Sequence, residues 1–158
     1  MKFLQVKCGL YDLLIDVAYI IEITSGSEVV ISNVGSSENI ASGTGVWREK
    51  TIEFIDMTLL FGGKSESEDK VIIIEAVNEL DNEEIKLLMI RVNEIEDIID
   101  YENQTLQEIP NYNLLLGNLV SSVVYSRNSG SYLFCLRLPI RTQELMMSYN
   151  NYTLKAQR

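Results

Sequence analysis

Acidic side chains are the residues of this chain that come closest to a catalytic arrangement. The carboxylate pairs Glu94/Glu96 and Asp97/Asp100 would suit a glycosidase-like reaction, in which one carboxyl group acts as acid and the other as base or nucleophile. That chemistry needs an apolar pocket to raise the pKa of one partner. The four residues instead lie in an acidic face with no such pocket evident, so we interpret them as solvent-exposed.

Other catalytic and metal-binding arrangements lack a required residue. The chain has no histidine, which removes Ser-His-Asp and Cys-His nucleophiles and most zinc sites. Gly62-Gly63-Lys64-Ser65 matches the end of a phosphate-binding loop, but its first glycine would fall at Thr58. Gly43-Thr44-Gly45 lacks the third glycine of a dinucleotide fingerprint, and the spacing of a calcium loop is absent. We expect no catalytic residue, no metal and no cofactor.

The net charge and the cysteines indicate which partners the protein can bind and in which cellular compartment it works. The formal net charge of −10 over 158 residues argues against nucleic acid and against an anionic membrane surface. No apolar run is long enough to span a membrane, and the N-terminus does not have the order of a signal peptide. Cys8 and Cys135 each lie in an apolar run and are predicted to be buried thiols. The sequence predicts a cytoplasmic globular protein.

The apolar residues mostly alternate, which predicts strands. We expect strands at Phe3–Cys8, Tyr11–Asp16, Tyr19–Thr24, Lys50–Asp56, Val71–Val77, Ile85–Val92, Leu119–Ser126 and Ser131–Leu138, and one short strand near Val29–Ile31 within a loop at Ser25–Ser42. The spacing of Val92, Ile95, Ile98 and Ile99 fits a helix by period, but their β-branched side chains favour a strand with a bulge.

Helices are expected only at two places. A short turn at Met57–Phe61 would end at Gly62-Gly63. Pro139 would open a helix through Ser148, because proline suits a first helical turn. The acidic loop at Lys64–Lys70 is interpreted as solvated. Many short strands with few helices predict an all-β fold of barrels rather than a doubly wound sheet.

One segment carries a spacing that composition alone does not produce. Residues 43–62, GTGVWREKTIEFIDMTLLFG, resemble the signature of the CheW family, G-x-x-N-L-R-G-x-x-x-P-x-x-D-L-x-x-x-F-G. Arg48, Asp56, Phe61 and Gly62 stand at the matching intervals, whereas Glu49 replaces a glycine and Glu53 a proline. Tyr19–Ile23 and Val92–Ile95 also match family segments, V-x-E-I and V-D-E-V.

The resemblance implies a fold and a role. It implies a single CheW-like domain over residues 1–158, made of two five-stranded barrel subdomains packed side by side, and a non-catalytic adaptor that couples chemoreceptors to the regulatory domain of a CheA-type histidine kinase. It implies that the receptor's helical tip lies in a groove between the barrels. The positions that would line or support this groove are Ile20, Glu22, Gly43, Arg48, Val71 and Ile95.

Two alternatives remain open at this point. One is a diverged CheW-like paralogue that binds the kinase poorly or serves another pathway, such as surface motility. The other, from a different class, is a small-molecule-binding β-barrel, which a closed cavity of ligand size would favour. The residues themselves also allow that Ile20, Val71 and Ile95 are ordinary core, and that Glu22 and Arg48 form a surface ion pair.

Overall fold

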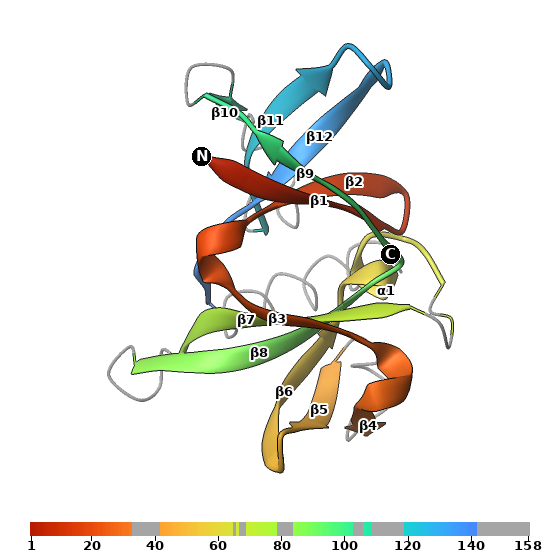
Figure 1. Ribbon diagram of the computed structural model, residues 1–158, viewed down its shortest axis with the longest axis vertical. Coiled ribbons are helices and arrows are strands. Elements are labelled where there is room, and N and C mark those ends of the chain that lie inside the picture. Colours follow the sequence, from red (N-terminus) through yellow and green to blue (C-terminus); the bar gives the residue numbers. More distant parts are fainter. Residues whose placement is uncertain are drawn as a thin grey trace, which may run out of the picture.

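The computed structural model of the protein consists of two curled sheets, one above the other in the view of Figure 1. It describes residues 1–32, 42–64, 66, 69–78, 84–102, 106–108 and 119–141. The short helix α1 (Met57–Leu60) and two 3₁₀ turns, η1 (Val17–Tyr19) and η2 (Gly26–Glu28), interrupt the strands. The all-β class expected from the sequence is confirmed. None of the helices in the described ranges is long and apolar enough to cross a membrane.

The first sheet joins the N-terminal hairpin to strands from the second half of the chain. Its order is β10-β11-β12-β2-β1-β9. Only the contact between β12 and β2 is parallel. The strands are β1 (Lys2–Cys8), β2 (Tyr11–Asp16), β9 (Glu94–Asp100), β10 (Gln107–Glu108), β11 (Val120–Ser126) and β12 (Ser131–Leu136).

The second sheet has the order β13-β7-β8-β6-β5-β4, and β3 also pairs with β7. The six-stranded and seven-stranded sheets exceed the five strands per barrel that the sequence implied, because short edge strands extend them. The strands are β3 (Ile20–Ser25), β4 (Val30–Ser32), β5 (Ser42–Trp47), β6 (Lys50–Asp56), β7 (Lys70–Asn78), β8 (Glu84–Val92) and β13 (Ile140–Arg141).

The strongly apolar strand β7 shows how the alternating pattern builds three cores. Ile72 and Ile74 point into a central cluster shared by both sheets, whereas Val71 and Ile73 point into a cluster of the second sheet alone. The first sheet has a third cluster around Phe3 and other buried side chains. Both faces of β7 are therefore covered, as its near-continuous apolar sequence predicts.

Most predicted strands are found within one or two residues of their expected bounds, including β9 with its bulge. The register between β1 and β9 shifts between Gln5 and Val6, which face Asp97 and Ile95 and leave Glu96 as the extra residue. Strand β5 was not predicted. It contains Gly45, where a side chain would come within 2.5 Å of the Met89 sulfur, so its glycine content reflects packing rather than a loop.

The predicted helix at Pro139–Ser148 is wrong at its start. Ile140 and Arg141 form β13, which pairs in parallel with Ala76 and Val77 of β7. Ile140 is buried in the central core, and this pairing overrides the local preference of proline for a first helical turn. Residues 142–148 lie outside the described ranges.

One departure from the family signature, Glu49 in place of glycine, lies in the tight turn between β5 and β6. Arg48 and Glu49 have φ angles of 48° and 64°, the left-handed region that favours glycine. Replacing Glu49 by glycine should therefore raise the free energy of unfolding by about 1 kcal/mol. Thermal unfolding of Glu49→Gly measures this.

The matched control is Lys50→Gly, which places glycine at the exposed start of β6, where no such strain exists. That variant should lower the melting temperature. A melting temperature that falls in Glu49→Gly, as it should in Lys50→Gly, would contradict the strain assigned to Glu49.

Candidate functional site

Two isoleucine pairs lie on the core-facing side of two edge strands, β3 of the second sheet and β9 of the first. On β3, Ile20 pairs with Ile74 and Ile23 pairs with Ile72, so both face the side of the central core. They share this face because the register shifts between Ile20 and Glu22, which places an extra residue, Ile21, in the strand. A regular strand would have put Ile20 and Ile23 on opposite faces.

A bulge also places two isoleucines of β9 on one face. Ile95 pairs with Val6 and Ile98 pairs with Leu4, and both partners belong to the central core. The bulge at Glu96 gives these two isoleucines a common face in spite of their odd spacing. Ile23 and Ile98 remain 43% and 61% exposed, so the described part of the core leaves much of these two side chains uncovered. We call Ile20, Ile23, Ile95 and Ile98 the isoleucine groove.

A cleft of about 730 Å³ lies at the Ile95 end of the isoleucine groove. It is open and largely polar, and its walls come from both sheets and from the loop before β7. The lining residues are Ser25, Ser27, Glu66, Asp69, Lys70, Asn93, Glu94 and Ile95. The second described cleft, of about 620 Å³ beside β9 and the β11–β12 turn, is also open, and Ile98 contributes to its lining. Neither supports the closed cavity of a small-molecule barrel.

The predicted contact between Glu22 and Arg48 is present and includes a third residue. Arg48 Nη2 donates to Glu22 Oε1 at 2.8 Å, and Trp47 Nε1 donates to Glu22 Oε2. The Arg48 guanidinium also lies over the Trp47 ring, 4.7 Å from its centre. Because Glu22 is on β3 and Trp47 ends β5, this cluster ties together two strands that are not neighbours in the sheet.

The Glu22 carboxylate should titrate below the ordinary range of glutamate. The hydrogen bond from Trp47 and then the charge and hydrogen bond of Arg48 lower the pKa of Glu22. A lowered folded-state pKa means that the stability from this cluster is present above the unfolded-state pKa and is lost as the pH falls through the folded-state pKa.

Trp47 is the only tryptophan, so its fluorescence reports this titration. We expect an acid transition with a midpoint below the usual glutamate pKa, absent in Glu22→Gln. A transition at or above the usual value, or one unchanged in Glu22→Gln, would contradict the assignment.

The remaining predicted site residues do not lie in the groove. Val71 is fully buried in the core of the second sheet, so it can support this region but cannot contact a partner. Gly43 is on β5, opposite Phe54, which belongs to the same core. Glu22 pairs in register with Ile73 and faces away from the groove. Ile20 and Ile95 therefore both pack against the central core, and Glu22 pairs with Arg48 as a separate set.

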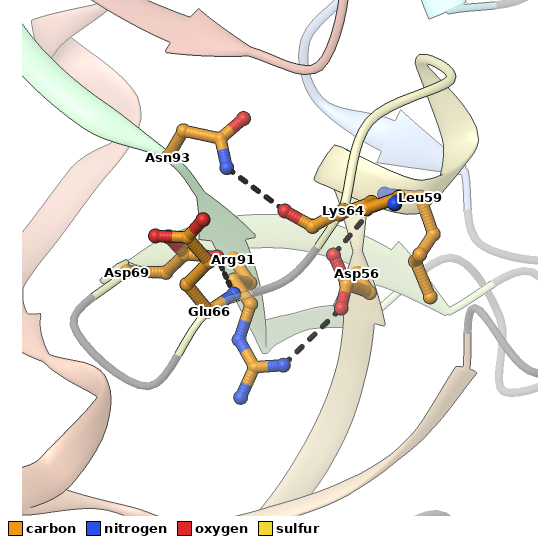
Figure 2. A network of polar contacts seen from close by, with 7 residues as sticks. All are labelled: Asp56, Leu59, Lys64, Glu66, Asp69, Arg91 and Asn93. Carbon is orange, nitrogen blue, oxygen red and sulfur yellow. Dashed lines mark hydrogen bonds and ion pairs between the residues drawn. The ribbon is translucent and has the colours of Figure 1, made fainter.

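The second half of the signature segment forms a junction between the sheets (Figure 2). Asp56 is almost fully buried, caps α1 by accepting from Leu59 N at 3.3 Å, and pairs with Arg91 at 3.2 Å. Phe61 contacts the Tyr11 ring edge-on, and its carbonyl accepts from Leu10 N at 3.0 Å. Gly62 follows with a φ of 82°, as expected for a residue that ends a helix.

Asp69 corrects the interpretation of the acidic loop before β7 as solvated. It is 4% exposed and accepts from Glu66 N at 2.7 Å, while its carbonyl accepts from Gly26 N at 2.9 Å. These bonds hold the loop against the start of η2 and give the open cleft a fixed wall. Burial of one carboxylate in a short charged segment cannot be recognised from composition.

The cysteines and the acidic residues that were considered as catalytic or metal-binding groups lie in different surroundings, the cysteines buried and the acidic residues exposed. Cys8 and Cys135 are buried free thiols, as predicted, and burial is the main cause that raises the pKa of each. Glu94, Glu96, Asp97 and Asp100 are exposed along β9. Partial loss of water around its carboxylate, and next the negative charge of Asp12, raise the pKa of Glu96. The same carboxylate accepts a hydrogen bond from Gln5 Nε2 at 2.6 Å. Among the described residues, no group of three acidic or cysteine side chains could hold a metal.

Comparison with known proteins agrees with this architecture. The family model of the CheW-like domain matches residues 2–138. The crystal structure of the scaffolding protein TtCheW from Thermoanaerobacter tengcongensis is similar, with a TM-score of 0.69 at 14% sequence identity, over 87% of this chain and 84% of that chain. A search of curated proteins gives no match. Because the family model spans most of the sequence, this chain belongs to the CheW-like domain family.

Proposed function

We propose that this protein is a non-catalytic adaptor of a bacterial chemosensory array. It binds the helical signalling tip of a chemoreceptor and the regulatory domain of a CheA-type histidine kinase, and it reaches the membrane-bound array only through these partners. Its place of action is the cytoplasm. Membership of the CheW-like family supports the class of function, and the isoleucine groove is the observation that carries the receptor-binding role.

The isoleucine groove fits an amphipathic helix. Such a helix presents apolar side chains at positions i, i+3, i+4 and i+7, and a groove walled by two isoleucine pairs can bury them. Ile23 and Ile98 are the most exposed members, so they have the most surface to lose on binding. The Glu22–Trp47–Arg48 cluster braces β3 from the opposite face and so keeps one wall in place.

Changing either exposed wall residue to aspartate should weaken receptor-tip binding without unfolding the protein. Burial of half an isoleucine is worth about 1 kcal/mol, and an aspartate there must also lose water, so we expect the Kd to rise at least about tenfold. Calorimetric titration of Ile23→Asp and Ile98→Asp with a receptor-tip helical hairpin measures this.

Val46→Asp is the matched control, because Val46 is 41% exposed on β5 and pairs with exposed Val30 outside the groove. It should leave the Kd unchanged. If Val46→Asp weakens binding as much as Ile23→Asp does, the groove is not the receptor site. A protein that binds the receptor tip but not the kinase regulatory domain would instead be a diverged paralogue.

A further inference from the structure

The two walls of the isoleucine groove are connected through a single residue. Strand β8 of the second sheet ends at Val92 and β9 of the first sheet begins at Glu94, so Asn93 alone links them. Ile95 follows two residues later, and Asn93 itself lines the open cleft beside it. The conformation of Asn93 therefore sets where the β9 wall starts.

Asn93 is held by three hydrogen bonds to both halves of the molecule. Its backbone N donates to Lys7 O at 2.9 Å, and its side-chain Oδ1 accepts from Gly9 N at 2.8 Å, both in the β1–β2 hairpin. Its Nδ2 donates to Lys64 O at 3.2 Å, in the segment that follows α1 (Figure 2). One carboxamide thus bridges the first sheet and the junction of the second.

These contacts require a side chain that donates and accepts at the same time. Gly9 supplies an N–H, which needs an oxygen partner, and Lys64 supplies a carbonyl, which needs a donor. An aspartate would keep the first bond but would place a carboxylate against the Lys64 carbonyl. An alanine would lose both. The orientation of the amide follows from its partners.

We propose that Asn93 is a positioning residue, which holds β9 and β3 at the separation that a docked helix needs. This inference rests on the proposed receptor-binding function. The broad central core and the bond from Leu10 N to Phe61 O hold the sheets together in its absence. Loss of the Lys64 bond therefore lets the β9 edge move relative to β3 rather than unfolding the protein.

The first test needs no partner. Ser27 and Glu94 are exposed and face the same cleft from the two sides. Cysteines at these positions can be spin-labelled selectively, because Cys8 and Cys135 are buried. The dipolar splitting should show one narrow separation in the parent and a broader or shifted one in Asn93→Ala and Asn93→Asp. Unchanged spectra in both variants would overturn the proposal.

The second test measures affinity for a receptor-tip helical hairpin. Loss of one well-placed hydrogen bond corresponds to roughly tenfold in an equilibrium constant, so Asn93→Asp should show about a tenfold higher Kd and Asn93→Ala, which loses two bonds, at least as large an increase. Gly130→Ala, which introduces strain in the β11–β12 turn, is the control for a small loss of stability and should keep the parent Kd.

The outcomes separate the two claims. A control that weakens binding as much as Asn93→Ala, or an Asn93→Ala variant with the parent Kd, would overturn the positioning role while leaving the adaptor function standing. If the parent protein binds no receptor tip, the adaptor function fails, and the spin-label result alone decides whether Asn93 fixes the two strands.

Discussion

Gly9→Ala is expected to lower the free energy of unfolding by about 2–4 kcal/mol, the sum of backbone strain and overpacking. Gly9 has a φ of 60°, and a Cβ there would lie 2.4 Å from the Phe61 carbonyl oxygen and 2.9 Å from Gly63 N. These neighbours are backbone atoms of the junction after α1, so they cannot move aside as a flexible side chain would. Thermal unfolding should show a fall of roughly 5–15 °C.

Gly130→Ala separates the two contributions. Gly130 has a similar φ of 66°, but nothing lies within 4 Å of the position of its Cβ. This variant should therefore lose only the conformational cost, about 1 kcal/mol. If Gly9→Ala lowers the free energy of unfolding no more than Gly130→Ala does, the added methyl group meets no resistance. The close backbone contact between the β1–β2 turn and the α1 junction would then not be rigid.

Asp56→Ala is expected to destabilise the protein by about 2–4 kcal/mol. The change removes the cap of α1 and leaves the partly buried Arg91 guanidinium without its carboxylate. The Asp56 side chain is only 3% exposed and that of Arg91 21%, so water can replace little of the lost interaction. Chemical denaturation of the variant measures the loss.

Glu53→Ala is the control for a surface ion pair. Glu53 contacts Lys86 at 2.8 Å, closer than Asp56 contacts Arg91, but its side chain is 51% exposed. Its loss should cost less than about 1 kcal/mol. Equal effects of Asp56→Ala and Glu53→Ala would mean that burial of the Asp56 pair does not matter, contrary to the account of the junction.

The sequence predicted best those strands in which the pattern of apolar residues matches the faces that are buried in the structure. Strands β1, β2, β6 and β7 alternate or are continuously apolar, and the fold needs no more than this pattern to place them. Strand β5 was missed because Gly45, which reads as a loop residue, packs closely against Met89 within the strand. Strand β13 was missed because its local sequence predicts a helix, and its extended conformation depends on pairing with the distant strand β7.

The groove could be predicted only in part. Ile20 and Ile95 came from family resemblance, whereas Ile23 and Ile98 depend on bulges that bring residues three apart onto one face. The odd spacing of Ile95 and Ile98 was visible, but period alone assigned it to a helix. Glu22 and Arg48 were correctly paired, yet Trp47, which completes the cluster, carried no signal of its own.

Adaptor function is tested most directly by a three-component binding experiment. A receptor-tip helical hairpin and a kinase regulatory domain are mixed with and without this protein and separated by size-exclusion chromatography. We expect the two to co-elute only when the protein is present, and Ile98→Asp to remove the receptor tip alone. Failure of the protein to bind either partner at high micromolar concentration would contradict the account.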